Sequence, residues 1–152
     1  MIAPPEVVDV PRQLTAVIPI VVPRSGIREV MGPAIQELIG AVVAQGVGPT
    51  GPWYGYHRRM DPDVFDFEVG VPTSAPVSPV GRVIPGALPA ARVARTIYSG
   101  SYEGLHEAWS ELVAWVEAQG LTPAPDLWER YVVGPESGPG PWQTELNRVV
   151  VR

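Results

Sequence analysis

Aromatic side chains and a few carboxylates are the residues of this chain whose types could do chemistry together. Aromatic faces bind flat apolar molecules and cations. The aromatic residues are Trp53, Tyr54, Tyr56, Phe65, Phe67, Tyr98, Tyr102, Trp109, Trp115, Trp128, Tyr131 and Trp142. Glu68 and Glu145 lie in strand-like segments among them. A carboxylate that faced an aromatic cleft would attract cations, or would act as a base with a raised pKa.

The composition excludes several other kinds of site. The chain has no cysteine, so disulfides, cysteine-ligated metals and cysteine nucleophiles are ruled out. His57 and His106 are too few and too far apart for a metal site, and no phosphate-binding glycine loop or Ser/His/Asp set is present. A net charge of −5 argues against direct binding of nucleic acid, which needs clustered Lys and Arg. We therefore expect no metal and no cofactor.

Each candidate residue has a structural explanation beside the functional one. Trp109 falls on an apolar helical stripe, which favours a core tryptophan over a ligand contact. Trp115 lies off that stripe, which places it at the surface, at a rim or in an interface. Glu68 alternates with the apolar residues of its strand, which favours solvent over a cleft, whereas the alternation around Glu145 leaves its face open.

An internal repeat determines how these residues are positioned. The segment "ELIGAVVAQGV" begins at Glu37, and "ELVAWVEAQGL" begins 74 residues later at Glu111. At the same offset, identical residues occur at Pro11/Pro85, Leu14/Leu88, Ala16/Ala90, Ser25/Ser99, Gly26/Gly100, Glu29/Glu103, Ala34/Ala108, Leu38/Leu112, Val42/Val116, Ala44/Ala118, Gln45/Gln119, Gly46/Gly120 and Pro49/Pro123. With small shifts, the W-x-x-Y of Trp53 and Tyr56 matches that of Trp128 and Tyr131, and "FEV" (67–69) matches "TEL" (144–146).

Each repeat reads as one strand, one helix and two further strands. The β-rich segments 15–22 and 91–98 come first, and helices with one apolar stripe follow over about 28–45 and 102–119. Gly46 and Gly120 stand where a glycine closes a helix. The remaining strands are 53–59 with 64–72, and 127–133 with 142–151; the turns between them are 61–63 and 135–141. Each unit is therefore predicted to be βαββ.

Two such units are expected to share one sheet and one core, because a single helix on three short strands buries little surface. We predict one domain over 1–152, with repeat one at about 5–73, a Pro/Ser-rich linker at 74–81 and repeat two at about 82–152. Duplicated halves leave a cleft where they meet. Function should lie where the copies differ, for example where Ile35 and Ala41 are replaced by Trp109 and Trp115.

The second half contains the segments "YSGSYEGLHEAWSELVAWVEAQGL", "WERYVVGP" and "PWQTEL", and the first half contains "GPWYGYHRRMDPDVFDFEVGVP". In these segments, in their order and in their spacing, the chain resembles the GyrI-like small-molecule-binding family. The resemblance implies an α+β fold of two βαββ repeats with pseudo-two-fold symmetry, in which a curved antiparallel sheet carries two helices on one side. It also implies a ligand in the central crevice. Because the repeats fill the chain, it looks like the stand-alone form of the effector-binding domain of multidrug-sensing transcription regulators.

The resemblance also suggests site residues. A buried glutamate near the end of the domain meets cationic aromatic drugs in the drug-sensing relatives, and Glu145 of "TEL" matches it by motif position. Tyr131 of "WERY" and Trp109, with Tyr56 and Tyr98, are the aromatic residues that we expect around it.

The leading hypothesis is binding of bulky aromatic, often cationic small molecules, for sequestration or sensing. One alternative is a hydrolase that detoxifies cyclopropane-bearing genotoxins, with Glu145 as general base and Tyr131 as proton donor. A second is a protein that interacts with DNA gyrase, and a homodimer is a further partner hypothesis. Because the N-terminus lacks a signal-peptide pattern and no apolar run is long enough to span a membrane, we expect a cytoplasmic protein with no membrane contact.

Overall fold

The computed structural model describes residues 2–23, 26–57, 64–100, 104–133 and 143–151. Within these ranges the elements in chain order are β1 (Glu6–Val10), β2 (Gln13–Pro23), α1 (Ile27–Ala44), β3 (Tyr54–His57), β4 (Val64–Pro72), β5 (Ile84–Leu88), β6 (Ala91–Ser99), α2 (Leu105–Ala118), β7 (Thr122–Val133) and β8 (Gln143–Val151). The turns predicted at 61–63 and 135–141, and the predicted start of the second helix at 102, lie outside the described residues. Neither helix combines the length and apolar character needed to cross a membrane, in the part of the chain that is described.

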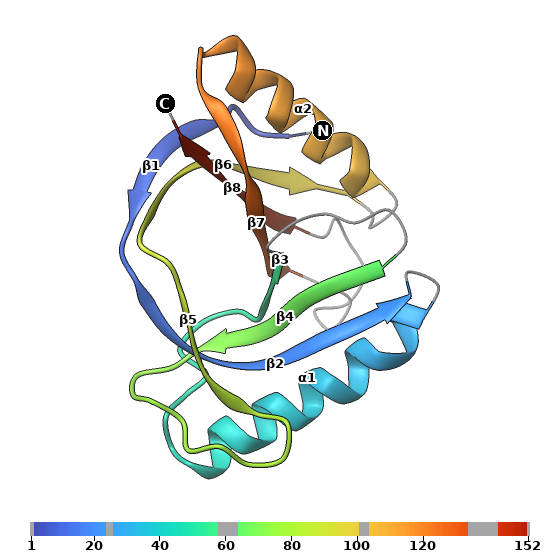
Figure 1. Cartoon of the computed structure of the whole chain (residues 1–152), viewed down its shortest axis with the longest axis vertical. Coiled ribbons are helices and arrows are strands. Elements are labelled where there is room, and N and C mark those ends of the chain that lie inside the picture. The colour runs from blue at the N-terminus through green and yellow to red at the C-terminus, as the bar shows by residue number, and fades with distance from the viewer. Residues whose placement is uncertain (1, 24–25, 58–63, 101–103, 134–142, 152) are drawn as a thin grey trace.

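The strands form one antiparallel sheet in the order β1-β6-β8-β7-β3-β4-β2-β5. The first four strands along the chain, β1 to β4, have β5 to β8 as their counterparts in the second half. When each strand is replaced by its counterpart, the result is the same order read from the opposite edge of the sheet. The sheet therefore has two-fold pseudo-symmetry about the pairing of β3 with β7. Figure 1 shows the sheet curled, with α1 beside β2 and α2 beside β6 and β8. The predicted α+β class, with two helix-bearing repeats, is confirmed.

Both helices pack on the same face of the sheet. Strand register makes Phe67, His57, Leu127, Arg148 and Ala94 successive partners across five strands, so their side chains share a face. Phe67 belongs to the apolar core under α1, and Ala94 to the core under α2. We call this the helix face. The opposite face carries its own apolar cluster, built around Tyr54, Leu88, Val93 and Trp128.

Strands β1 and β5 are absent from the predicted βαββ pattern. Each precedes the first predicted strand of its repeat, and each pairs with the other half: β1 lies beside β6, and β5 lies beside β2. Both form an edge of the sheet, where a proline such as Pro85 is tolerated because its missing N–H costs no ladder hydrogen bond. The neighbouring prolines, which sequence reading takes for loop signals, conceal these strands.

The predicted match between the two W-x-x-Y motifs is wrong by one residue. Trp53 stacks on Tyr131 on the helix face, whereas Trp128 packs near Tyr56 on the opposite face. A shift of one residue inverts the face of every side chain in a strand. When the two halves are matched at an offset of 74 residues, each side chain in these strands lies on the same face as its counterpart. At this offset Gly55 corresponds to Glu129, and the two residues are direct partners in the pairing of β3 with β7.

Substitution of Gly70 by Ala is expected to destabilise the centre of the sheet. A Cβ at Gly70 would lie 2.6 Å from the phenol of Tyr54, which is 2% exposed and has little room to move. Such overpacking costs about 1–3 kcal/mol, which thermal unfolding would report as a lower Tm. Gly40→Ala is the matched control, because a Cβ there meets nothing within 4 Å on the exposed surface of α1, and Ala favours a helix. Equal Tm values for Gly70→Ala and the parent chain would contradict the packing described.

Candidate functional site

Glu129 lies at the centre of the helix face, on one of the two middle strands. Its backbone pairs with Gly55 of β3, and its side chain points towards α2. The residue is only 8% exposed. Its carboxylate accepts a hydrogen bond from Trp109 Nε1 at 2.6 Å and another from the Tyr131 hydroxyl at 2.7 Å. Trp109 belongs to α2 and Tyr131 to β7, so the carboxylate joins helix and sheet.

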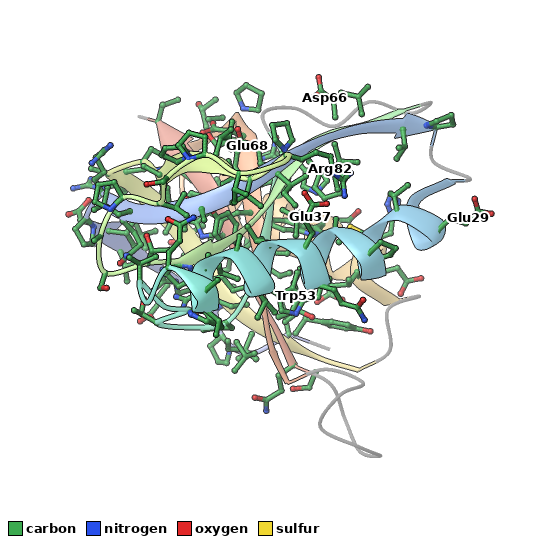
Figure 2. The ribbon with its side chains drawn as sticks, turned by 90° about the horizontal axis from the view of Figure 1, so that it is seen from below. Glu29, Glu37, Trp53, Asp66, Glu68 and Arg82 are labelled. Carbon is green, nitrogen blue, oxygen red and sulfur yellow. The ribbon has the colours of Figure 1, made fainter. Side chains whose placement is uncertain are left out.

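Aromatic rings continue the site from Glu129 towards α1. The rings of Trp53 and Tyr131 stack with centroids 4.0 Å apart and an interplanar angle of 29°. Trp53 also packs against the core under α1, and Figure 2 shows its side chain next to this helix. Gly55 leaves room for the side chain of Tyr131, since a Cβ there would lie 3.4 Å from the Tyr131 hydroxyl. We call Glu129, Trp109, Tyr131, Trp53 and Gly55 the central cluster.

Burial raises the pKa of the Glu129 carboxyl above its ordinary value, because removal from water disfavours the charged form. The hydrogen bonds from Trp109 and Tyr131 act in the other direction, since both donors stabilise the carboxylate. A positive charge brought next to Glu129 would favour ionisation further. The arrangement can therefore recognise a cation by charge and by aromatic contact at once.

Only two of the five predicted site residues belong to the central cluster, Trp109 and Tyr131. Glu145 lies on the opposite face, because it pairs with Arg130, whereas Tyr131 pairs with Thr144. The structure therefore does not bring Glu145 and Tyr131 together, as the predicted base and proton donor would require.

Glu145 is surrounded by polar and positively charged groups. Its Oε1 lies 3.4 Å from Arg95 Nε and 3.5 Å from Arg130 Nη1, and it accepts a hydrogen bond from Asn147 Nδ2 at 3.0 Å. Two guanidinium groups thus already compensate this carboxylate. A role for Glu145 in holding a cation stays a prediction, and it would have to compete with these arginines.

The other two predicted residues are not members of the central cluster. Tyr56 is on the opposite face, where its hydroxyl donates a hydrogen bond of 2.9 Å to Asp126. Tyr98 is 5% exposed within the core under α2. Glu68 pairs with Tyr56 in register and so also lies on the opposite face, where it is partly buried.

The sequence pattern predicts Tyr131 as a site residue but does not predict Glu129, two positions before it. Both occur in the segment "WERY", where residues two apart in a strand share a face. A carboxylate two positions from a tyrosine within a strand is thus a signal that could have found it. Among the described residues, no three His, Asp or Glu side chains gather as a metal site would require.

Glu129→Gln is expected to stabilise the folded chain at neutral pH. Because the folded state raises the pKa of Glu129, the carboxyl favours folding most below its ordinary value of 4.5, and this contribution is lost as pH rises through the raised value. Gln has no such loss, so its advantage in Tm should be largest at neutral pH and shrink towards pH 4.5. About 1 kcal/mol shifts the Tm of a chain this size by about 2–4 °C.

The measurement is thermal unfolding at several pH values, with Glu117→Gln on the exposed surface of α2 as control. A Tm difference for Glu129→Gln that is constant across this range would contradict the raised pKa.

Comparison with solved structures shows the same fold in several proteins. The C-terminal domain of EcmrR is 22% identical, with a TM-score of 0.82, and the match covers 98% of each chain. In an EcmrR–DNA complex, the match has 19% identity and a TM-score of 0.82, and covers 98% of this chain but only 57% of the EcmrR chain. No curated protein sequence matches the chain.

Two further structures share the fold at lower similarity. SAV2435, in its structure bound to tetraphenylphosphonium, is 13% identical with a TM-score of 0.71, over 98% of this chain and 94% of that one. A hydrolase encoded by lin2189 of Listeria innocua is 13% identical with a TM-score of 0.67, over 97% and 91% of the two chains. The family model for the GyrI-like small molecule binding domain matches residues 4–147. The chain therefore belongs to the GyrI-like small molecule binding domain family.

Proposed function

We propose that the chain binds bulky aromatic cations at the central cluster, as a sequestering protein or as a sensor. The observation that carries this proposal is the carboxylate of Glu129, which is buried among aromatic side chains and held by Trp109 and Tyr131. Among the described residues no ion pair includes Glu129. A buried carboxylate in this state is costly, and a lipophilic cation supplies a positive charge together with apolar surface. Each contact of a cation with an aromatic face adds about 0.5–2 kcal/mol.

Proton release is expected to accompany binding. The pKa of Glu129 is raised by burial in the free chain, and an adjacent cation lowers it by favouring the charged form. In the pH range where Glu129 is partly protonated, a bound cation therefore displaces its proton. Affinity for the cation should accordingly increase with pH over this range, while affinity for a neutral ligand should not.

The family and one relative support this choice of ligand. The family is defined by small-molecule binding, and SAV2435 shares the fold in a structure that contains tetraphenylphosphonium. Tetraphenylphosphonium is an aromatic cation and serves as the probe for this chain. Triphenylphosphine oxide, which is neutral and has three of the same rings, serves as the comparison ligand.

Glu129→Gln is expected to weaken tetraphenylphosphonium binding by about tenfold to a hundredfold, because a desolvated charge-assisted contact contributes about 1.5–3 kcal/mol. Isothermal titration calorimetry should show little change for triphenylphosphine oxide. Glu145→Gln is the matched control on the other face of the sheet, where Arg95 and Arg130 already compensate the carboxylate.

The two glutamates give distinguishable outcomes. A selective loss of cation binding in Glu145→Gln but not in Glu129→Gln would move the site to the opposite face, as the sequence motif suggested. Equal weakening of both ligands in Glu129→Gln would mean that the residue supports the fold rather than the charge recognition.

A hydrolase acting on electrophilic small molecules is the second candidate. It is favoured by the 2.7 Å hydrogen bond between the Tyr131 hydroxyl and Glu129, which sets a possible proton donor beside a carboxyl with a raised pKa. Carboxyl groups of this kind act as general bases near neutral pH. The Listeria innocua hydrolase shares the fold.

If the chain is a hydrolase, mass spectrometry should detect addition of water to a cyclopropane-bearing alkylating agent, and Tyr131→Phe should slow it by about a hundredfold or more. Unchanged substrate after prolonged incubation with the parent chain would exclude this reaction for that compound. Four expectations from the sequence stay predictions: contact with DNA gyrase, a homodimer, a single domain over 1–152 and a cytoplasmic location.

A further inference from the structure

The linker between the repeats is fastened to α1 by a glutamine at the end of the helix. Gln45 Nε2 donates a hydrogen bond to the carbonyl of Ser78 at 2.9 Å. In return, the backbone N–H of Ser78 donates to Gln45 Oε1 at 2.7 Å. One side-chain amide thus holds both polar groups of one residue of an extended segment.

Two turns earlier on α1, Glu37 holds the same segment through an arginine. Arg82 donates to Glu37 Oε1 from Nη2 at 2.8 Å and from Nε at 3.1 Å, and its backbone N–H donates to Oε2 at 3.1 Å. These bonds lower the pKa of Glu37. Figure 2 shows the two side chains directed towards each other. Val77 and Val83 of the segment are buried against the core under α1.

Helix α2 carries the same two residues at the same places. Glu111 and Gln119 lie 74 residues after Glu37 and Gln45. The helix ends match in detail: the N–H of Gln45 bonds to the carbonyl of Ala41 at 3.2 Å, and that of Gln119 bonds to the carbonyl of Trp115 at 3.1 Å. Gly46 and Gly120 then follow with φ values of 68° and 78°. The two glutamate–glutamine pairs are therefore displayed on equivalent surfaces.

On α2 this pair holds no segment within the described residues. Glu111 and Gln119 are both exposed, and in residues 2–23, 26–57, 64–100, 104–133 and 143–151 neither side chain has a hydrogen bond or ion pair. The N-terminal segment runs near α2, where Ile2 packs against its core, but Ala3 directs its peptide groups to β6.

One difference between the helices places an aromatic side chain between the glutamate and the glutamine of α2. Ala41 lies between Glu37 and Gln45, whereas the partly buried Trp115 lies between Glu111 and Gln119. Residues four apart on a helix share a face, so Glu111, Trp115 and Gln119 form one row. We call this row the α2 stripe. An indole face beside a carboxylate suits an arginine, which can stack on the ring while bonding to the acid.

We propose that the α2 stripe docks an extended, arginine-bearing segment of a partner protein, in the way that α1 docks the chain's own linker. The arginine would form paired hydrogen bonds with Glu111, and Gln119 would clasp the peptide groups of the residue four positions earlier, as Arg82 and Ser78 do on α1. The proposal is independent of the proposed ligand site, which lies between α2 and the sheet, whereas Glu111 and Gln119 of the α2 stripe are exposed. The chain's net charge of −5 also favours a basic partner.

The test uses the full chain and a fluorescein-labelled peptide that copies residues 74–83, "SAPVSPVGRV". Fluorescence anisotropy is expected to show saturable binding that weakens with added salt. Glu111→Gln should weaken it by about threefold to tenfold, as expected for a solvent-exposed charge pair with good geometry. Gln119→Ala should weaken it by a similar factor, because two hydrogen bonds to peptide groups are lost. Glu117→Gln, which alters an exposed carboxylate on the same helix away from the stripe, should leave it unchanged.

A charge exchange separates this contact from general attraction to an acidic protein. Glu111→Arg should abolish binding of the original peptide and bind a peptide in which the arginine is replaced by glutamate. Absence of saturable binding at millimolar peptide, or equal effects of the Glu111 and Glu117 variants, would overturn the proposal. Binding sensitive to Glu37→Gln instead would mean that the peptide displaces the linker on α1. Self-association abolished by Glu111→Arg would make the occupant a second copy of the chain.

Discussion

The pairing of β3 with β7 is the interaction on which the rest of the structure depends. It joins the two halves at the middle of the sheet, and the alternation of side chains along it decides what each face receives. Glu129 and Tyr131 are directed to the helices, while Arg130 is directed to the other face, where it meets Glu145. One residue of slip in this pairing would exchange the two sets, leaving arginine under α2 and separating the carboxylate from Trp109.

The two faces treat a carboxylate in opposite ways. Arginines on the two neighbouring strands form ion pairs with Glu145, so its charge is compensated by residues of the sheet itself. Glu129 receives hydrogen bonds from neutral donors instead, which satisfy its oxygens but supply no positive charge, and burial raises its pKa. Hydrogen bonds from the indole of Trp109 and the phenol of Tyr131 fix the orientation of the Glu129 carboxyl group without adding a positive charge beside it. A carboxyl group held in this way can release its proton when a cation comes to lie beside it.

The sequence was sufficient for the repeats and helices but not for the faces of the strands. The helices were predictable because apolar residues recur with helical period and because Gly46 and Gly120 adopt the left-handed conformation that ends a helix. The face of the sheet on which Glu129 lies was not predictable from the sequence. Strand β7 has irregular register between Pro123 and Leu127 and again between Tyr131 and Val133, and each irregularity interrupts the alternation of side chains between the two faces. Motif position alone predicts Glu145 as a site residue, and motif position carries no information about which face a strand residue occupies.

The exchanged edge strands have a consequence for how the molecule assembles. Glu6 of the first half pairs with Arg95 of the second, so the sheet is completed only when segments far apart in the chain meet. Such non-local contacts raise the contact order and place the fold among the slower-folding topologies. Neither half carries all the strands of its own side, since each borrows an outer strand from the other. Two identical single units exchanging the same strand would form a closed symmetric pair, and fusing their genes end to end would give a chain with this topology.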